Sequence, residues 1–194
     1  MAAAIDEIGP ERLNEYSQVP TAFMVTSVLS MDSVDGGLGG ILFREKTVQP
    51  PYIKDYDACD DGGPLAWPGR FDVRNWGFLL AREKSRPVGG AAVAFATPGV
   101  HMLAGRRDLA VLWDIRVHPG VRRSGIGSAL FERAVGWART RGAGQLKIET
   151  QNINVPACRF YAKQGCHLGE IDSYAYRRHP DFAHEVMLIW YFDL

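Results

Sequence analysis

Residues 122–127, Arg-Arg-Ser-Gly-Ile-Gly, combine residue types that can hold an anion, at the point where an apolar run gives way to a helical pattern. The first N–H groups of a helix are unpaired, and the helix dipole adds about half a positive charge there. Gly125 and Gly127 lack a Cβ, so the backbone can approach a ligand closely. Arg122 and Arg123 can neutralise further charge. This stretch therefore predicts a site for a pyrophosphate.

Two other phosphate-binding motifs do not fit this stretch. A Walker A loop ends in Gly-Lys-Ser/Thr, whereas Gly125 is followed by Ile126 and Gly127. A dinucleotide-binding fingerprint needs a third glycine where Leu130 stands, and no acid about 20 residues further on clearly suits a ribose. A plain tight turn would account for one glycine but not for the second glycine or the arginine pair.

Length and composition indicate one globular protein with a local site. The 194 residues include 22 basic and 22 acidic side chains, so no overall charge favours nucleic acid or an anionic membrane. The three cysteines show no CxxC spacing, which favours a reducing, cytoplasmic setting. Acidic residues near the start do not suit a signal peptide, and we expect neither such a peptide, nor a membrane span, because no apolar run reaches roughly 18 residues, nor a metal site, because no cluster has metal-ligand spacing.

The elements that must position the site follow from hydrophobic periodicity and turn residues. Residues 49–69 are too rich in Pro, Gly and Asp for a regular element, so we expect a loop that is either solvated or covers a substrate. The remaining pattern predicts strands at 22–32 and 41–48, a hairpin over 76–99 with a loop of several residues at 82–87, a strand at 109–119, a helix at 127–142, a strand at 145–150, a helix at 154–165 and a strand at 185–194. This order predicts an α+β (mixed α/β) domain around one sheet, with no linker.

Two motifs now carry a family resemblance. Val117-x-Pro119-x-x-Arg122-x-x-Gly125-x-Gly127 resembles the acyl-CoA pyrophosphate loop of the GNAT N-acetyltransferase superfamily. Asn154-x-x-Ala157-x-x-Phe160-Tyr161-x-x-x-Gly165 resembles the second cofactor segment of the same superfamily. Residues 50–57, 149–165, 169–176 and 184–194 are similar to the streptothricin acetyltransferase subgroup. Cys166 departs from the pattern, because the superfamily usually has Phe there.

The resemblance implies a fold and a set of cofactor contacts. It implies a GNAT-like, mostly antiparallel twisted sheet of about six to seven strands, flanked by helices, with a splayed strand pair at the cofactor site. It implies one domain over 1–194, with residues 1–75 as a divergent acceptor side and 76–194 as the acetyl-CoA-binding core. The residues that it assigns to acetyl-CoA are Ile115, Arg116, Val117, Arg122, Arg123, Ser124, Gly125, Ile126, Gly127, Ser128, Asn154, Ala157, Phe160 and Tyr161.

The chemistry implied is direct attack of an amine on the thioester. Tyr161 is the candidate acid for the leaving thiolate, and the Val117 N–H is the candidate oxyanion donor. Asp114 interrupts an apolar strand, and Glu149 ends the neighbouring one. Either acid could bind the amine or accept its proton, and we favour Asp114 over Glu149 as the substrate-binding acid. An ion pair with Arg116 or Lys147 is the alternative.

We therefore expect a cytoplasmic, acetyl-CoA-dependent N-acetyltransferase acting on a small cationic amine, with streptothricin as the candidate. Nucleic acid, membrane and metal are not expected, and we also consider a homodimer. A protein lysine or N-terminal acetyltransferase and a non-catalytic acyl-CoA sensor remain alternatives. Further candidates for the acceptor pocket, or else for surface roles, are Asp172, Tyr174, Tyr176 and Glu185.

Overall fold

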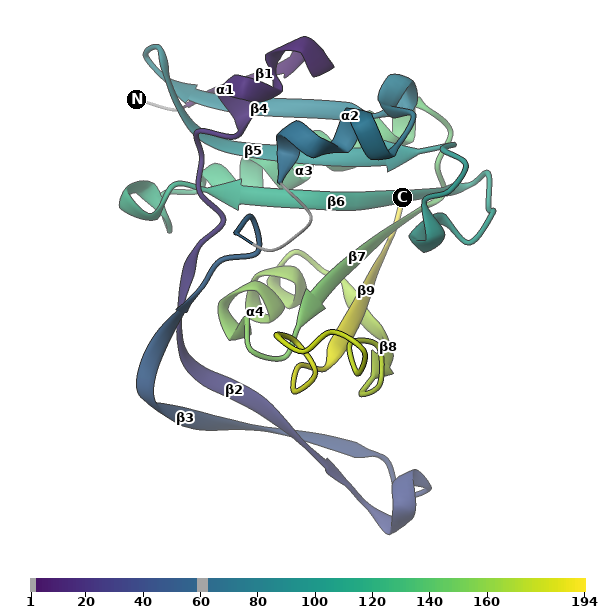
Figure 1. Ribbon diagram of the computed structural model, residues 1–194. Coiled ribbons are helices and arrows are strands. Elements are labelled where there is room, and N and C mark those ends of the chain that lie inside the picture. The colour runs from purple at the N-terminus through teal and green to yellow at the C-terminus, as the bar shows by residue number, and fades with distance from the viewer. Residues whose placement is uncertain (1–2, 59–62) are drawn as a thin grey trace. The chain divides into compact units, whose positions relative to one another are not determined.

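The computed structural model describes residues 3–58 and 63–194, and Figure 1 shows its elements. The chain packs into two compact units, which we describe separately. The first contains Met1–Phe23, Asp55–Ile148 and Tyr191–Leu194, and the second contains Met24–Lys54 and Glu149–Trp190. A single N-acetyltransferase domain divided at residue 75 stays a prediction.

A seven-stranded sheet carries the fold and has the strand order β1-β4-β5-β6-β7-β9-β8. The pairs β1–β4, β4–β5 and β5–β6 are antiparallel, and β6–β7 is parallel. The fold is therefore α+β with a mostly antiparallel sheet, which confirms the predicted class. The strands are β1 (Ala4–Ile8), β4 (Gly77–Glu83), β5 (Arg86–Phe95), β6 (Leu109–Val117), β7 (Gln145–Gln151), β8 (His167–Asp172) and β9 (Met187–Asp193).

Helices of the first unit cover both faces of β4–β6 (Figure 1). In α3 (Ile126–Thr140), the buried residues Ile126, Leu130, Ala134 and Ala138 recur every four positions, which gives the helix one apolar side. The short helices α1 (Leu13–Tyr16) and α2 (Trp67–Arg70) lie on the other face of the sheet. No helix in the described part of the chain is both long enough and apolar enough to cross a membrane.

An aromatic cluster fills the space beneath α1 and α2. Trp67 stacks on Phe78 of β4 with ring centroids 6.2 Å apart, and Tyr16 meets Trp67 edge-on at 5.7 Å. Gly90 of β5 makes room for this arrangement, because a Cβ there would lie 2.5 Å from Cε2 of Tyr16. The missing side chain thus lets Tyr16 reach the sheet beside β6.

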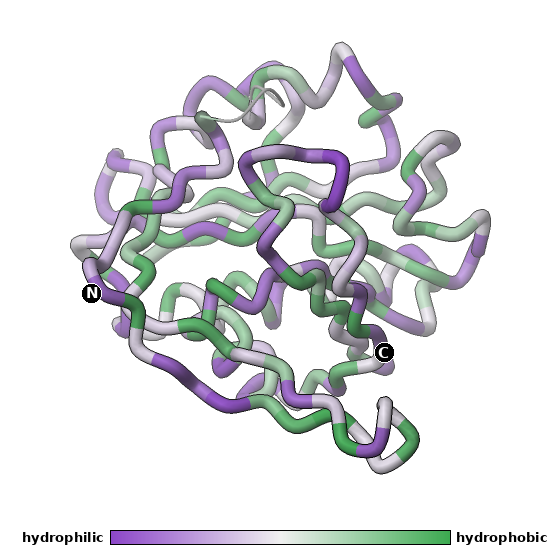
Figure 2. Tube along the Cα trace, turned by 60° about the horizontal axis from the view of Figure 1, so that its bottom comes forward, coloured by the Kyte–Doolittle hydropathy of each residue, from purple (hydrophilic) through white to green (hydrophobic). Residues whose placement is uncertain are grey.

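The second unit contains α4 (Val155–Lys163) and a ribbon made of β2 (Phe23–Ser33) and β3 (Ile41–Lys54). Hydrophobic residues lie at the exposed end of this ribbon, where Figure 2 shows green beside purple; Leu38 is 92% exposed. The expectation of a loop over 49–69 was wrong for Gln49–Lys54, which continue β3. Proline is compatible with an edge strand because it only lacks a donor there.

Other local expectations also need correction. The hairpin turn contains only Lys84 and Ser85, because Arg82 pairs with Pro87 and Glu83 with Arg86. Lys84 has φ +56°, which lets a two-residue turn close the hairpin. Short helical turns occur at Pro64–Ala66 and Trp67–Arg70, inside the expected loop. The sequence pattern missed β1, α1 and β8, which are too short or too polar to show a clear period.

Strand β6 changes its pairing at Trp113. The register with β5 skips this residue, since Ala92 pairs with Asp114 and Val93 with Leu112. Parallel pairing with β7 runs from Leu109 to Leu112, whereas β6 continues to Val117. A bulge bends a strand and redirects its side chains. This is the local geometry that a splayed strand end requires.

Candidate functional site

The predicted anion loop lies between the end of β6 and the start of α3. A short 3₁₀ turn, Pro119–Val121, follows β6. The Gly120 N–H of this turn donates to Nδ1 of the His118 ring at 3.2 Å. Gly125, the N-cap residue of α3, has φ +92° and ψ −10°, and no side chain caps the helix. The N–H groups of the first turn therefore have no side-chain cap, and residues 122–125 before them are exposed, as an anion site requires.

The polar side chains of this loop have different surroundings. Arg122 donates from Nε to the Val117 carbonyl at 3.1 Å and from Nη2 to the Ala22 carbonyl at 2.8 Å, so its guanidinium fixes the loop to neighbouring backbone. Ser124 donates to the Val121 carbonyl at 2.6 Å. Arg123 is exposed and has φ +63°. Among the described hydrogen bonds, the side chain of Arg123 makes no contact with backbone like those of Arg122.

Arg116, near the end of β6, is the centre of a buried ionic cluster. Its side chain is 2% exposed, and its Nε and Nη2 donate to the two oxygens of Asp114 at 2.7 and 3.1 Å. Its Nη1 and Nη2 donate to Asp57 at 2.6 and 3.2 Å, and Nη1 also donates to the Val19 carbonyl at 3.0 Å. These five contacts match the five N–H groups of a guanidinium. The ion pair between Asp114 and Arg116, an alternative from sequence, is present.

Tyr16 completes this cluster from the opposite side. Its hydroxyl donates to Oδ2 of Asp114 at 2.5 Å, and its ring is fully buried. Burial first, and then the charge of Asp114, raise the pKa of Tyr16 well above its ordinary value, so it stays a donor. One guanidinium and two carboxylates leave one net negative charge, and Asp57 keeps 28% of its side chain exposed. The cluster can therefore attract a cation.

In the second unit, α4 carries the second predicted motif. Asn154 caps this helix, because its side chain accepts from the Ala157 N–H at 3.3 Å, as predicted. Tyr161 lies two turns further along the same helix and is 5% exposed. Its ring contacts Phe160 at 5.4 Å and Trp190 at 6.4 Å between centroids. The packing role of the tyrosine ring is thus visible, and its proposed role as an acid stays a prediction.

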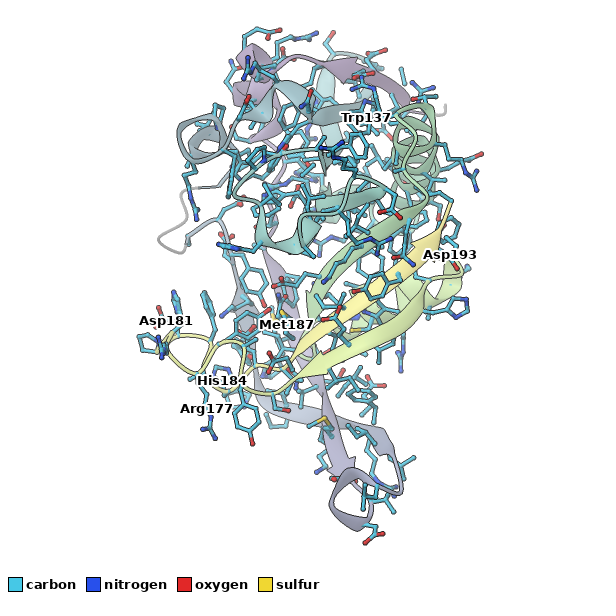
Figure 3. The ribbon with its side chains drawn as sticks, turned by 90° about the vertical axis from the view of Figure 1, so that its right-hand side faces the viewer. Trp137, Arg177, Asp181, His184, Met187 and Asp193 are labelled. Carbon is cyan, nitrogen blue, oxygen red and sulfur yellow. The ribbon has the colours of Figure 1, made fainter. Side chains whose placement is uncertain are left out.

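Two neutral groups donate hydrogen bonds to Glu149. The hydroxyl of Tyr176 donates to Oε1 of Glu149 at 2.6 Å, and the amide of Gln151 donates to the same oxygen at 3.3 Å. Tyr176 belongs to the segment between β8 and β9, on which Figure 3 marks Arg177, Asp181 and His184. Sequence similarity selected Tyr176, but nothing in the sequence linked it to Glu149.

The other residues named for the acceptor side differ in exposure. Glu185 is 1% exposed and forms an ion pair with Lys54 at 2.6 Å. Asp172 accepts from the backbone N–H of Tyr174 at 2.7 Å, and Tyr174 is 64% exposed. The buried ion pair gives the Glu185 carboxylate a structural role. The exposure of Tyr174 places this residue at the surface.

The thiols and the possible metal ligands of the described residues do not form a further reactive site. Cys158 and Cys166 are buried and free, and burial raises the pKa of each to about 12. Cys59 lies outside the described residues. Within residues 3–58 and 63–194, no group of three or more His, Cys, Asp or Glu side chains is arranged to hold a metal ion.

The structure thus brings the predicted residues together in two sets. Within the first unit, the end of β6 (Ile115, Arg116 and Val117) leads directly into residues 122–128 at the start of α3. Within the second unit, Glu149 lies two residues before the end of β7, and α4, which carries the other motif, follows that strand. Sequence reasoning missed Tyr16 and Asp57, whose partners are far away along the chain.

Comparison with known proteins supplies the family. Residues 45–166 match the Acetyltransferase (GNAT) family. The streptothricin acetyltransferase of Escherichia coli is 30% identical over 182 residues, which cover 94% of this chain and 91% of that protein. A crystal structure of nourseothricin acetyltransferase has a TM-score of 0.77 at 24% identity and covers 100% of this chain and 99% of its own. A Bacillus anthracis acetyltransferase in complex with acetyl coenzyme A has a TM-score of 0.76 at 23% identity, with coverage of 100% and 98%.

Proposed function

Because this chain belongs to the acetyltransferase (GNAT) family, we propose that it transfers acetyl from acetyl-CoA to an amine of a small cationic compound, with streptothricin as the candidate acceptor. Membership of the family makes the chain an acetyl-CoA-dependent N-acetyltransferase. The observation that carries the choice of acceptor is the 30% identity to a streptothricin acetyltransferase along nearly the whole length of both proteins.

The loop at the start of α3 supports the binding of the pyrophosphate of acetyl-CoA. Its first-turn N–H groups have no side-chain cap, and Gly125 adopts a backbone conformation that other residues rarely take. Arg122 holds the loop in place through the Val117 and Ala22 carbonyls, and we assign the neutralisation of the pyrophosphate charge to Arg123, which is also exposed. We assign the same loop residues, 122–128, to the cofactor as the family motif implies.

Two carboxylate groups support a cationic acceptor. The Arg116 cluster carries one net negative charge, part of it on the exposed side of Asp57. Glu149 is bound by a hydroxyl and an amide, both of them neutral donors. Since Asp114 already accepts from Arg116 and Tyr16, we assign the attraction of the cation to its cluster and the acceptance of the proton to Glu149.

In this proposal each side chain has one task. Acetyl-CoA supplies the acetyl group as a thioester. Glu149 takes a proton from the ammonium of the acceptor, directly or through water, so that the nitrogen lone pair can attack. The Val117 N–H donates to the thioester oxygen as negative charge develops on it. As the C–S bond of the tetrahedral intermediate breaks, Tyr161 gives its hydroxyl proton to the departing sulfur and takes up the second proton that the nitrogen loses as it becomes an amide. Glu149 then releases its proton to solvent.

The experiment that tests this function is steady-state thiol release with acetyl-CoA and a panel of amines. We expect a kcat/KM for streptothricin at least ten-fold above those for spermidine and a lysine peptide. If streptothricin is no better than these amines, the choice of acceptor fails while acetyl transfer survives. If acetyl-CoA binds in calorimetry but no amine in the panel releases thiol, the chain is an acyl-CoA sensor and the proposal fails.

A further inference from the structure

The surroundings of Glu149 contain a second group with a defined geometry. Glu149 and Gln151 are two positions apart on β7, so their side chains project from the same face of the strand. The hydroxyl of Tyr176 lies 2.6 Å from Oε1 of Glu149, and Nε2 of Gln151 lies 2.9 Å from that hydroxyl. Because Gln151 donates to the hydroxyl, the only proton of the hydroxyl is directed to the carboxylate.

The environment keeps Tyr176 protonated. Burial first, and then the negative charge of Glu149, raise the pKa of Tyr176 above its ordinary value. Glu185 acts in the same direction, and Lys54 is paired with Glu185 at 2.6 Å. The ring of Tyr176 packs edge-on against Phe182 at 6.4 Å. A phenol held in this way stays a hydrogen-bond donor to the carboxylate.

We propose that Tyr176 is a positioning residue for Glu149: it fixes the orientation of the carboxylate and favours the ionised form that accepts the proton of the amine. This inference rests on the proposed function, because it presupposes that Glu149 takes part in acetyl transfer. Its physical basis is that a hydrogen bond to a charged acceptor is about twice as strong as one between neutral groups. Gln151 supports the same geometry by holding the hydroxyl oxygen.

The first test replaces the donor alone. Tyr176→Phe should lower kcat about 10- to 100-fold, as expected when a hydrogen bond to a charged group is lost, with the KM for acetyl-CoA nearly unchanged. The acidic limb of the kcat/KM profile should move to higher pH by about one unit, because the ionised carboxylate loses a stabilising donor. Tyr52→Phe is the matched control, since it removes the hydroxyl of another, exposed tyrosine of the second unit and should change neither quantity.

A double-mutant cycle with Glu149→Gln tests whether Tyr176 acts through Glu149. We expect Tyr176→Phe to cost less than two-fold in the Glu149→Gln background. Equal losses in both backgrounds would assign the tyrosine a structural role and overturn the inference. A wild-type rate for Glu149→Gln would overturn it as well. If Tyr176→Phe does not fold, the same cycle with Gln151→Met removes the supporting donor and must show the same dependence on Glu149. Turnover of the wild-type chain, measured first, separates these results from a failure of the proposed function.

Discussion

Removal of the Arg116 guanidinium should destabilise the protein far more than removal of an ion pair of the same geometry at the surface. Arg116→Met deletes five hydrogen bonds and leaves two carboxylates, those of Asp57 and Asp114, without their shared cation. Breaking a buried ion pair by removing one partner costs about 3–5 kcal/mol. We expect a value near the lower end, about 3 kcal/mol, because Asp57 is 28% exposed and can be hydrated in the variant.

Arg106 provides the matched control, because it also holds an aspartate two positions away with two hydrogen bonds. Its Nε and Nη2 donate to Asp108 at 3.0 and 2.8 Å, but the two side chains are 42% and 62% exposed. Arg106→Met should therefore cost less than about 1 kcal/mol. Urea denaturation followed by tryptophan fluorescence measures both changes. Similar losses for the two variants, or a loss below about 1 kcal/mol for Arg116→Met, would refute the energetic reasoning about the buried cluster.

Three further changes test other parts of the structure. In Gly125→Ala the added Cβ lies more than 4 Å from the other atoms considered, but the residue must adopt φ +92°, which strains the backbone by about 1–2 kcal/mol. This strain should weaken acetyl-CoA binding about 5- to 30-fold in calorimetry. The control Gly105→Ala, also at positive φ and in open space, should leave the affinity unchanged. Tyr161→Phe should lower kcat about 10²–10⁴-fold with little effect on the KM for acetyl-CoA, and an unchanged kcat would limit the hydroxyl to packing. Burial raises the pKa of the Cys158 and Cys166 thiols to about 12, so both should react with iodoacetamide at pH 8 about 10³-fold more slowly than in the unfolded protein. Peptide mass spectrometry measures these rates, and equal rates in the folded and unfolded protein would contradict the burial of the thiols.

The parts of the fold that sequence predicts best are those with a strong local signal. The four-residue period of α3, the Asn154 cap of α4 and the apolar run of β6 each arise from neighbouring residues, and the structure confirms them. Proline misled the prediction at Gln49–Lys54, because its local preference does not exclude an edge strand. Helix α1 has only four residues, which are too few to show a helical hydrophobic period.

The candidate site was predictable to the extent that its residues are adjacent in the chain. The cofactor loop is contiguous, and so its residues could be named together. The ionic cluster could not, because Tyr16 and Asp114 are 98 residues apart and Asp57 and Arg116 are 59 residues apart. Only the folded chain places them in contact. The contact of Tyr176 with Glu149, 27 residues apart, is of the same kind.

The most direct test of the central claim, acetyl transfer to a cationic amine, is the identification of the product. The purified chain is incubated with acetyl-CoA and streptothricin, and the antibiotic is analysed by mass spectrometry with fragmentation. We predict the gain of one acetyl group on the β-lysine amine, dependent on acetyl-CoA and strongly reduced by Tyr161→Phe. Unmodified streptothricin after prolonged incubation, with acetyl-CoA shown to be bound, would contradict the account.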